Sequence, residues 1–137
     1  MPSLLELVSS CPRRQAAAGD VVLEQGAAAS VLLVLLEGEV EVLRDETRVA
    51  RSAEPGAIFG EMSVLLGAPC TATVRALKPS TFAVMPEPDR FLRESPDVAR
   101  QVAVLLARRL DALNRYLIDV KRQYEGHDHL GMVDEVL

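Results

Sequence analysis

The stretch Phe59–Arg75, which reads FGEMSVLLGAPCTATVR, decides the fold of this 137-residue chain. Gly60 stands before the carboxylate of Glu61 at the start of a short apolar run. Glycine lets the backbone turn sharply, and an acid in the first helical turn suits the positive end of the helix dipole. Residues 67–69, Gly-Ala-Pro, end the run, and β-branched residues follow at 71–74. This order predicts a turn, a short helix whose first N–H groups can bind an anion, a second turn and a strand.

The same stretch resembles the phosphate-binding cassette of the cyclic nucleotide-binding domain family. The family pattern is F-G-E, an apolar residue, a small residue and an apolar run, then R-[ST]-A-[ST]-V. The matching positions are Phe59, Gly60, Glu61, Met62, Ser63, Thr71, Ala72, Thr73 and Val74. Cys70 stands where the family carries the arginine that pairs with the cyclic phosphate, and no arginine or lysine occurs between Glu61 and Val74. The motifs E-G-E-V-E-V at 37–42 and P-G-x-x-F-G-E at 55–61 also recur in the family.

The composition fits one domain with a sizeable core, since 49% of the residues are apolar. No apolar stretch approaches the roughly 18 residues that span a membrane, and the start lacks the pattern of a secretory signal. The net charge of −5 argues against nucleic acid as a partner. The two cysteines, Cys11 and Cys70, show no metal-ligand spacing. We therefore expect a cytoplasmic protein in a reducing setting.

Short β-like segments separated by turn residues fill the chain from Arg13 to Val84. The expected strands lie at 21–23, 31–36, 39–43, 47–50, 71–76 and 81–85, with Ile58-Phe59 leading into the cassette. The unbroken apolar run at 31–36 predicts a strand buried on both faces. Glu37-Gly38 predicts a hairpin that joins this run to 39–43, where Val40 and Val42 point inward and the acids outward.

These segments predict a mainly β fold with some α: an antiparallel β-roll, or double-stranded jelly roll, flanked by short helices and a long C-terminal helix. The resemblance implies the same fold from Leu4 to Tyr124, about nine-tenths of the chain. Short helices are expected at 2–9 and 88–93. We expect residues 1–125 to form a cyclic nucleotide-binding-like domain that includes the C-terminal helix, about 96–125, and residues 126–137 to form a tail.

The long helix should begin with Ser95 as N-cap and Pro96 at its first position. A heptad seam of apolar residues follows it: Ala103, Leu106, Leu110, Leu113, Leu117, Val120 and Tyr124. A helix of about 30 residues is about 45 Å long, which is more than a small β-roll covers. The seam therefore predicts a homodimer through this helix, with docking on the same chain or on a larger partner as the alternatives.

The resemblance also implies a ligand site. In the family, the glycine at position 60 offers its backbone to the ribose–phosphate ring, and the glutamate at position 61 accepts a hydrogen bond from the ribose 2′-OH. The implied ligand-binding residues are Gly60, Glu61, Met62, Ser63, Cys70 and Thr71. A side chain of the long helix caps the base in the family, and the candidates in range are Arg108, Arg109, Leu113 and Asn114.

Cys70 changes what this site can bind. Arginine offers a bidentate, charged fork to a phosphate, whereas a thiol is a weak donor. Losing one partner of a buried charge pair costs roughly 2–5 kcal/mol, which is about 30- to 3000-fold in affinity. Arg75 lies five residues along the chain, about 16 Å at ~3.3 Å per residue, and should not reach the site.

Two functions follow as alternatives. The first is a regulatory, ligand-binding module whose affinity for cyclic AMP or cyclic GMP is weakened or altered. The second is a structural module that binds no ligand and acts through the long helix. An enzyme is not expected, because no Ser–His–Asp or Cys–His constellation is present in the core. No cofactor is expected, and His127 and His129 in the tail fit solvated side chains better than a metal site.

Overall fold

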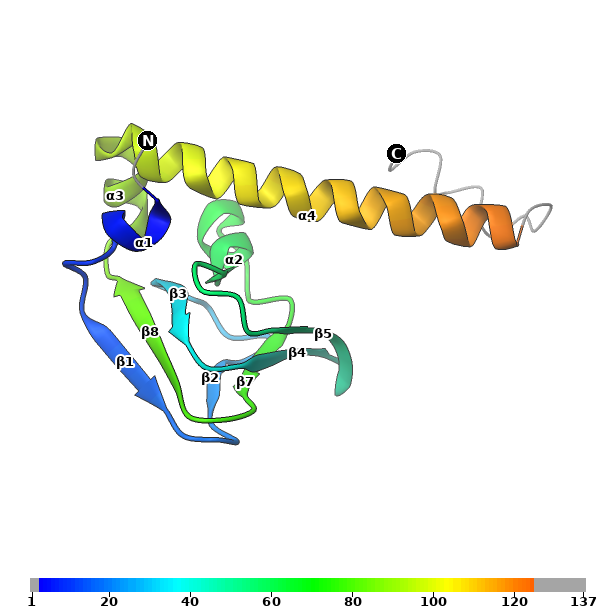
Figure 1. The fold of residues 1–137 in the computed structure, drawn as a ribbon, viewed down its shortest axis with the longest axis horizontal. Helices are drawn as coiled ribbons and strands as arrows, with labels where there is room; N and C mark the ends of the chain where they lie inside the picture. Colours follow the sequence, from blue (N-terminus) through cyan, green and yellow to red (C-terminus); the bar gives the residue numbers. More distant parts are fainter. Residues whose placement is uncertain (1–2, 125–137) are drawn as a thin grey trace. The chain divides into compact units, whose positions relative to one another are not determined.

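The computed structural model describes residues 3–124, and it divides the chain into two units, residues 1–99 and 100–137. The first unit contains two short-stranded sheets and three short helices (Figure 1). Its elements are α1 (Leu4–Leu7), β1 (Arg13–Ala16), β2 (Val21–Leu23), β3 (Leu32–Glu37), β4 (Val40–Arg44), β5 (Thr47–Ser52), β6 (Ile58–Phe59), α2 (Glu61–Leu66), β7 (Thr73–Ala76), β8 (Ser80–Met85) and α3 (Pro88–Glu94). The long helix α4 (Pro96–Gln123) starts in the first unit and makes up the described part of the second.

All strand pairs are antiparallel, and they form two four-stranded sheets with the orders β1-β8-β3-β6 and β2-β7-β4-β5. The predicted fold class, a β-roll with flanking helices and a long C-terminal helix, is confirmed. The strand at Arg13–Ala16 had no separate prediction, and the strand expected at 71–76 begins at Thr73. The predicted tail, 126–137, lies outside the described residues.

The core lies on β3 and the strands around it. Leu32, Leu33, Val34 and Leu35 are all fully buried, so β3 is covered on both faces, as the unbroken apolar run predicts. One face joins a cluster contributed by both sheets, whose members are Ala16, Val22, Leu33, Leu35, Val40, Ala57, Phe59, Val74, Ala76 and Phe82. Burial of these side chains is the main stabilising contribution to the roll.

The predicted hairpin between 31–36 and 39–43 is wrong. β3 and β4 belong to different sheets, and the chain turns from one sheet to the other at Gly38. Gly38 has φ +114°, and a Cβ there would lie 2.2 Å from Ser80 Oγ and 2.6 Å from Ser80 Cα. Only glycine fits this corner, because it combines a left-handed φ with direct contact with β8.

The strand expected at 47–50 is confirmed as β5, which pairs with β4. The turn between them places Asp45 and Glu46 at φ +50° and +67°, a conformation that Asn and Asp tolerate better than most residues. Gln25 holds this turn with two hydrogen bonds: its Nε2 donates to Asp45 Oδ1 at 2.8 Å, and its Oε1 accepts from the Asp45 N–H at 2.9 Å.

The helix starts agree with the capping residues in the sequence. Ser3 Oγ accepts from the Glu6 N–H at the start of α1, and Ser95 Oγ accepts from the Val98 N–H at the start of α4. The helix expected at 2–9 is present as the shorter α1, and the helix expected at 88–93 is present as α3 with nearly the same bounds. Within residues 3–124, no helix is long and apolar enough to cross a membrane.

Candidate functional site

The cassette begins where β6 passes into α2 through Gly60. Gly60 has φ +91°, and a Cβ there would lie 3.0 Å from the backbone carbonyl oxygen of Val31. The absence of a side chain lets this turn pack against the segment that enters β3. The next residue, Glu61, opens α2, and the residue is 9% exposed. The predicted turn from Gly60 into a helix that starts with Glu61 is therefore present, and Glu61 is nearly buried.

Ser63 holds the cassette to a neighbouring loop. Its hydroxyl accepts from the Ala29 N–H at 3.0 Å and donates to the carbonyl of Ala68 in a short hydrogen bond. Ser63 is buried, so both contacts are shielded from water. The pattern predicted a small residue here, but it gave no sign of the partner loop, which lies 34 residues away. Ser63 is thus a positioning residue of the cassette.

Position 70 is fixed by its backbone. The Cys70 N–H donates to the carbonyl of Ala27 at 2.8 Å, and the Cys70 carbonyl accepts from the Gly26 N–H at 2.8 Å. The thiol is free of any disulfide, and the residue is 8% exposed. The backbone N–H of Cys70 is therefore already bonded, and its thiol is only a weak hydrogen-bond donor.

The two halves of the cassette meet at Met62 and Thr71. Thr71 Oγ1 lies 3.9 Å from Met62 Sδ, and both residues are exposed. The structure thus brings the predicted site residues of positions 60–63 and 70–71 into one turn–helix–turn unit. The site residues predicted on the long helix lie in the other unit of the chain, and their role as base caps stays a prediction: Arg108, Arg109, Leu113 and Asn114.

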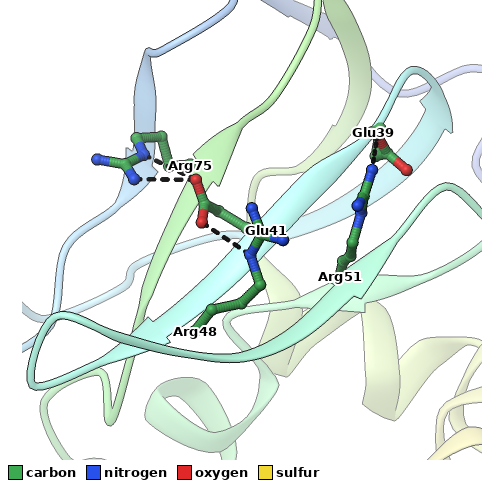
Figure 2. Close-up of polar contacts among 5 residues, drawn as sticks. All are labelled: Glu39, Glu41, Arg48, Arg51 and Arg75. Carbon is green, nitrogen blue, oxygen red and sulfur yellow. Dashed lines mark hydrogen bonds and ion pairs between the residues drawn. The ribbon is translucent and has the colours of Figure 1, made fainter.

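Arg75 is held by Glu41 on the second sheet (Figure 2). Its Nε and Nη2 donate to Glu41 Oε2 at 3.1 and 2.9 Å, and Arg48 Nε donates to Glu41 Oε1 at 3.1 Å. Beside this group, Arg51 donates to Glu39 at 2.8 Å. Arg75 is thus held on a structural ion pair, in agreement with the expectation that it does not serve the phosphate position.

The expectation that the acids of β4 point outward to solvent is wrong for Glu41, which is 5% exposed. Glu41 is covered by arginines from β5 and β7, the strands on either side of β4. The sequence gave no signal for this cluster, because Arg75 is 34 residues from Glu41 and sheet partners are not local.

The ion-pair cluster predicts how stability changes in acid. The hydrogen bonds from Arg75, and then those from Arg48, hold the pKa of Glu41 below its ordinary value, and Arg51 does the same for the pKa of Glu39. A depressed folded-state pKa stabilises the fold above the unfolded pKa of about 4.3, and this stability is lost as the pH falls through the folded value. Urea unfolding from pH 7 to pH 3 should show a falling midpoint below about pH 5, with a shallower fall in Glu41→Gln.

The matched control for this prediction is Glu54→Gln, which removes an exposed carboxylate. Its midpoint should follow the natural protein at every pH. Parallel profiles for Glu41→Gln and the natural protein would show that the pairs contribute nothing to acid stability.

A cavity of about 580 Å³ lies beside the far end of the cassette, between α2 and α3. Ser63, Val64 and residues 67–69 line one side, and residues 86–90 with Arg93 line the other. None of Gly60, Glu61, Cys70 or Thr71 lines it. Among residues 3–124, no group of three or more His, Cys, Asp or Glu side chains is arranged to hold a metal ion. His127 and His129 lie outside the described residues.

Comparison with known proteins identifies the family. Residues 13–93 match the family described as the cyclic nucleotide-binding domain, which is more than half of the chain. The chain belongs to the cyclic nucleotide-binding domain family. The resemblance carried by the cassette is therefore confirmed, and this family is a regulatory binding domain rather than a catalytic one.

Three similar proteins show how far the likeness extends. The crystal structure of the Thermus thermophilus catabolite activator protein has a TM-score of 0.73 and 29% identity, covering 88% of this chain and 60% of that one. A cyclic nucleotide-binding domain from Methylobacillus flagellatus KT has a TM-score of 0.68 and 25% identity, covering 91% and 84%. An uncharacterized ABC transporter ATP-binding protein of Mycobacterium bovis is 38% identical over 68 residues. That match covers 47% of this chain and 21% of the relative, so the chain spans about a fifth of such curated relatives.

Proposed function

We propose that this cyclic nucleotide-binding domain is a ligand-binding regulatory module whose affinity for cyclic AMP and cyclic GMP is weakened or altered. The observation that carries the proposal is the buried Cys70 in an otherwise complete cassette. The Gly60 turn, the nearly buried residue Glu61 and the Ser63 contacts favour a site that still binds a ligand. On ligand binding, the cassette and the long helix would move together and change a dimer or partner surface. We also propose that the protein is cytoplasmic, because its two cysteines fit a reducing setting.

The affinity follows from the missing charge. A fully placed arginine in a buried site contributes roughly 2–5 kcal/mol to anion binding, because its removal leaves the anion desolvated and unpaired. Cys70 retains at most a weak S–H donor. Cyclic AMP and cyclic GMP should therefore bind weakly. At concentrations that would saturate a site with the arginine, they should raise the melting temperature of this protein only a little.

Calorimetric titration of cyclic AMP and cyclic GMP into the natural protein and into Cys70→Arg tests the proposal. Weak binding by the natural protein with tight binding by the variant supports it. Absence of binding by both proteins would show that the cassette is only scaffold, and the function would then lie in the long helix.

The second candidate is a module that dimerises through α4 without a ligand. Of the predicted seam, Leu110 is 54% exposed and Leu113 is 49% exposed, and Tyr124 is exposed as well. Ala103 is also exposed, whereas the seam residues Leu106, Leu117 and Val120 are half-buried. Exposed leucines at heptad spacing on a 28-residue helix favour a partner helix over free solvation.

A double substitution, Leu110→Asp with Leu113→Asp, tests the homodimer. Two charges on the seam should convert a micromolar dimer into a monomer, because a coiled-coil interface does not accommodate unpaired carboxylates. Sedimentation equilibrium measures the change. Ala112→Asp, an exposed site on another face of the same helix, should leave the mass unchanged. A natural protein that sediments as a monomer at micromolar concentration would rule out the dimer.

A further inference from the structure

The cassette exposes a methionine sulfur at the point where its two halves meet. Met62 lies in the first turn of α2 and is 47% exposed, whereas Met85 at the end of β8 is fully buried. The hydroxyl of Thr71, on the other half of the cassette, donates to Met62 Sδ at 3.9 Å. A thioether is a weak acceptor, so this contact holds the two halves together only loosely.

Among the described residues of the first unit, Met62 is the side chain that an oxidant should modify first. Peroxide converts an exposed thioether to a sulfoxide, which reductases return to methionine. The two thiols suit this reaction less, since Cys11 and Cys70 are both buried and burial raises the pKa of the Cys11 thiol. Leu65 and Leu66, three and four residues further along α2, are 48% and 69% exposed. A polar oxygen on Met62 would therefore lie at a surface in contact with water and not in the core.

We propose that Met62 is a reversible oxidation site whose sulfoxide oxygen accepts a hydrogen bond from the Thr71 hydroxyl. In the reaction with hydrogen peroxide, the sulfur takes one oxygen, the O–O bond breaks, and the other oxygen leaves as water with both protons. The sulfur loses two electrons and the peroxide gains them. An oxygen acceptor in place of the sulfur would strengthen the contact between the two halves of the cassette.

The stronger contact has a consequence for ligand binding, and this consequence rests on the proposed function. Thr71 is one of the ligand-binding residues that the family motif predicts. A hydroxyl carries a single donor, so a Thr71 that donates to the sulfoxide has no proton left to give to a ligand. Oxidation of Met62 should therefore weaken ligand binding and leave the roll folded.

Peptide mass spectrometry of the natural protein, treated with hydrogen peroxide, measures where oxidation occurs. Sulfoxide should form at Met62 about tenfold faster than at Met85, because reactivity follows exposure. Met1 and Met132 lie outside the described residues, and their peptides are measured separately. Equal rates at Met62 and Met85, in protein that thermal melting shows to be folded, would overturn the inference.

Thr71→Val tests the hydrogen bond, because valine has the shape of threonine without the hydroxyl. Oxidation should raise the melting temperature of the natural protein by about 2–6 °C relative to its effect on Thr71→Val, as expected for one neutral hydrogen bond. Met62→Leu forms no sulfoxide at this position, so any change that peroxide causes in it comes from other sites and is subtracted. Methionine sulfoxide reductase should reverse the change in the natural protein. An equal effect of oxidation on the natural protein and on Thr71→Val would overturn the inference.

Cys70→Arg, the variant expected to bind cyclic AMP tightly, tests the effect on the ligand. Oxidation should lower its affinity about 2- to 12-fold, the fold-change that corresponds to one neutral hydrogen bond, and should not change the affinity when Met62→Leu is added. An unchanged affinity in oxidised Cys70→Arg would overturn the role of Met62 in binding. If reduced Cys70→Arg does not bind cyclic AMP, the proposed function falls, and the thermal comparison with Thr71→Val alone decides the inference.

Discussion

Cys70→Arg is expected to raise the affinity of this domain for cyclic AMP by about 30- to 3000-fold, the fold-change that corresponds to roughly 2–5 kcal/mol. The reason is that arginine supplies a bidentate, charge-assisted partner for the phosphate, which the thiol does not. The backbone at position 70 is already held by Ala27 and Gly26, so the substitution changes the side chain and keeps the strand entry in place. Calorimetric titration beside the natural protein measures the gain.

Cys70→Ser is the matched control, because it has nearly the size of cysteine and brings a hydroxyl without a charge. Its affinity for cyclic AMP should stay within about tenfold of the natural value, as a neutral hydrogen bond contributes about 0.5–1.5 kcal/mol. A Cys70→Arg variant that is folded by thermal melting and still binds as weakly as Cys70→Ser would show that charge at this position does not limit binding.

Gly38→Ala is expected to destabilise the β-roll by about 2–6 kcal/mol, which is a large part of the stability of a typical domain. Backbone strain at φ +114° contributes about 1–3 kcal/mol of this, and overpacking against β8 contributes a similar amount. The new methyl group would lie 2.6 Å from Ser80 Cα, so a side-chain rotation cannot relieve the clash and the backbone of β8 must move. Urea unfolding measures the loss.

Gly19→Ala separates the strain from the clash. Gly19 has φ +91°, and a Cβ there meets nothing within 4 Å. This variant should lose only about 1–2 kcal/mol, the cost of a left-handed conformation for a residue with a side chain. Equal losses of unfolding free energy in the two variants would contradict this prediction. They would mean that the backbone around Gly38 and Ser80 shifts enough to relieve the clash.

The sequence predicted local features well and pairings poorly. The burial of 32–35, the cap at Ser95 and the turn at Gly60 all depend on residues close together in the chain, and the structure agrees with each. The choice of sheet for β4 depends instead on β7, about 34 residues away, so alternation alone suggested a hairpin with β3.

The candidate site also contains some features that local sequence predicts and others that depend on distant segments. The turn, the acid and the small residue of the cassette follow a local pattern, and positions 60–63 lie as that pattern predicts. The contact from Ser63 to Ala29 and the cover of arginines over Glu41 were not predictable, because each joins segments that only the folded roll brings together. Even the in–out alternation of β4 was misleading at Glu41, where paired charges replace solvent.

The backbone hydrogen bonds of Cys70 have an evolutionary consequence. Ala27 and Gly26 hold residue 70 through its main chain, so these two hydrogen bonds are available to any residue there except proline, which lacks the N–H. Selection can therefore act on the chemistry of this position separately from the stability of the domain. Under the proposed function, a single substitution at position 70 would change the ligand that the cassette prefers while these main-chain contacts stay in place.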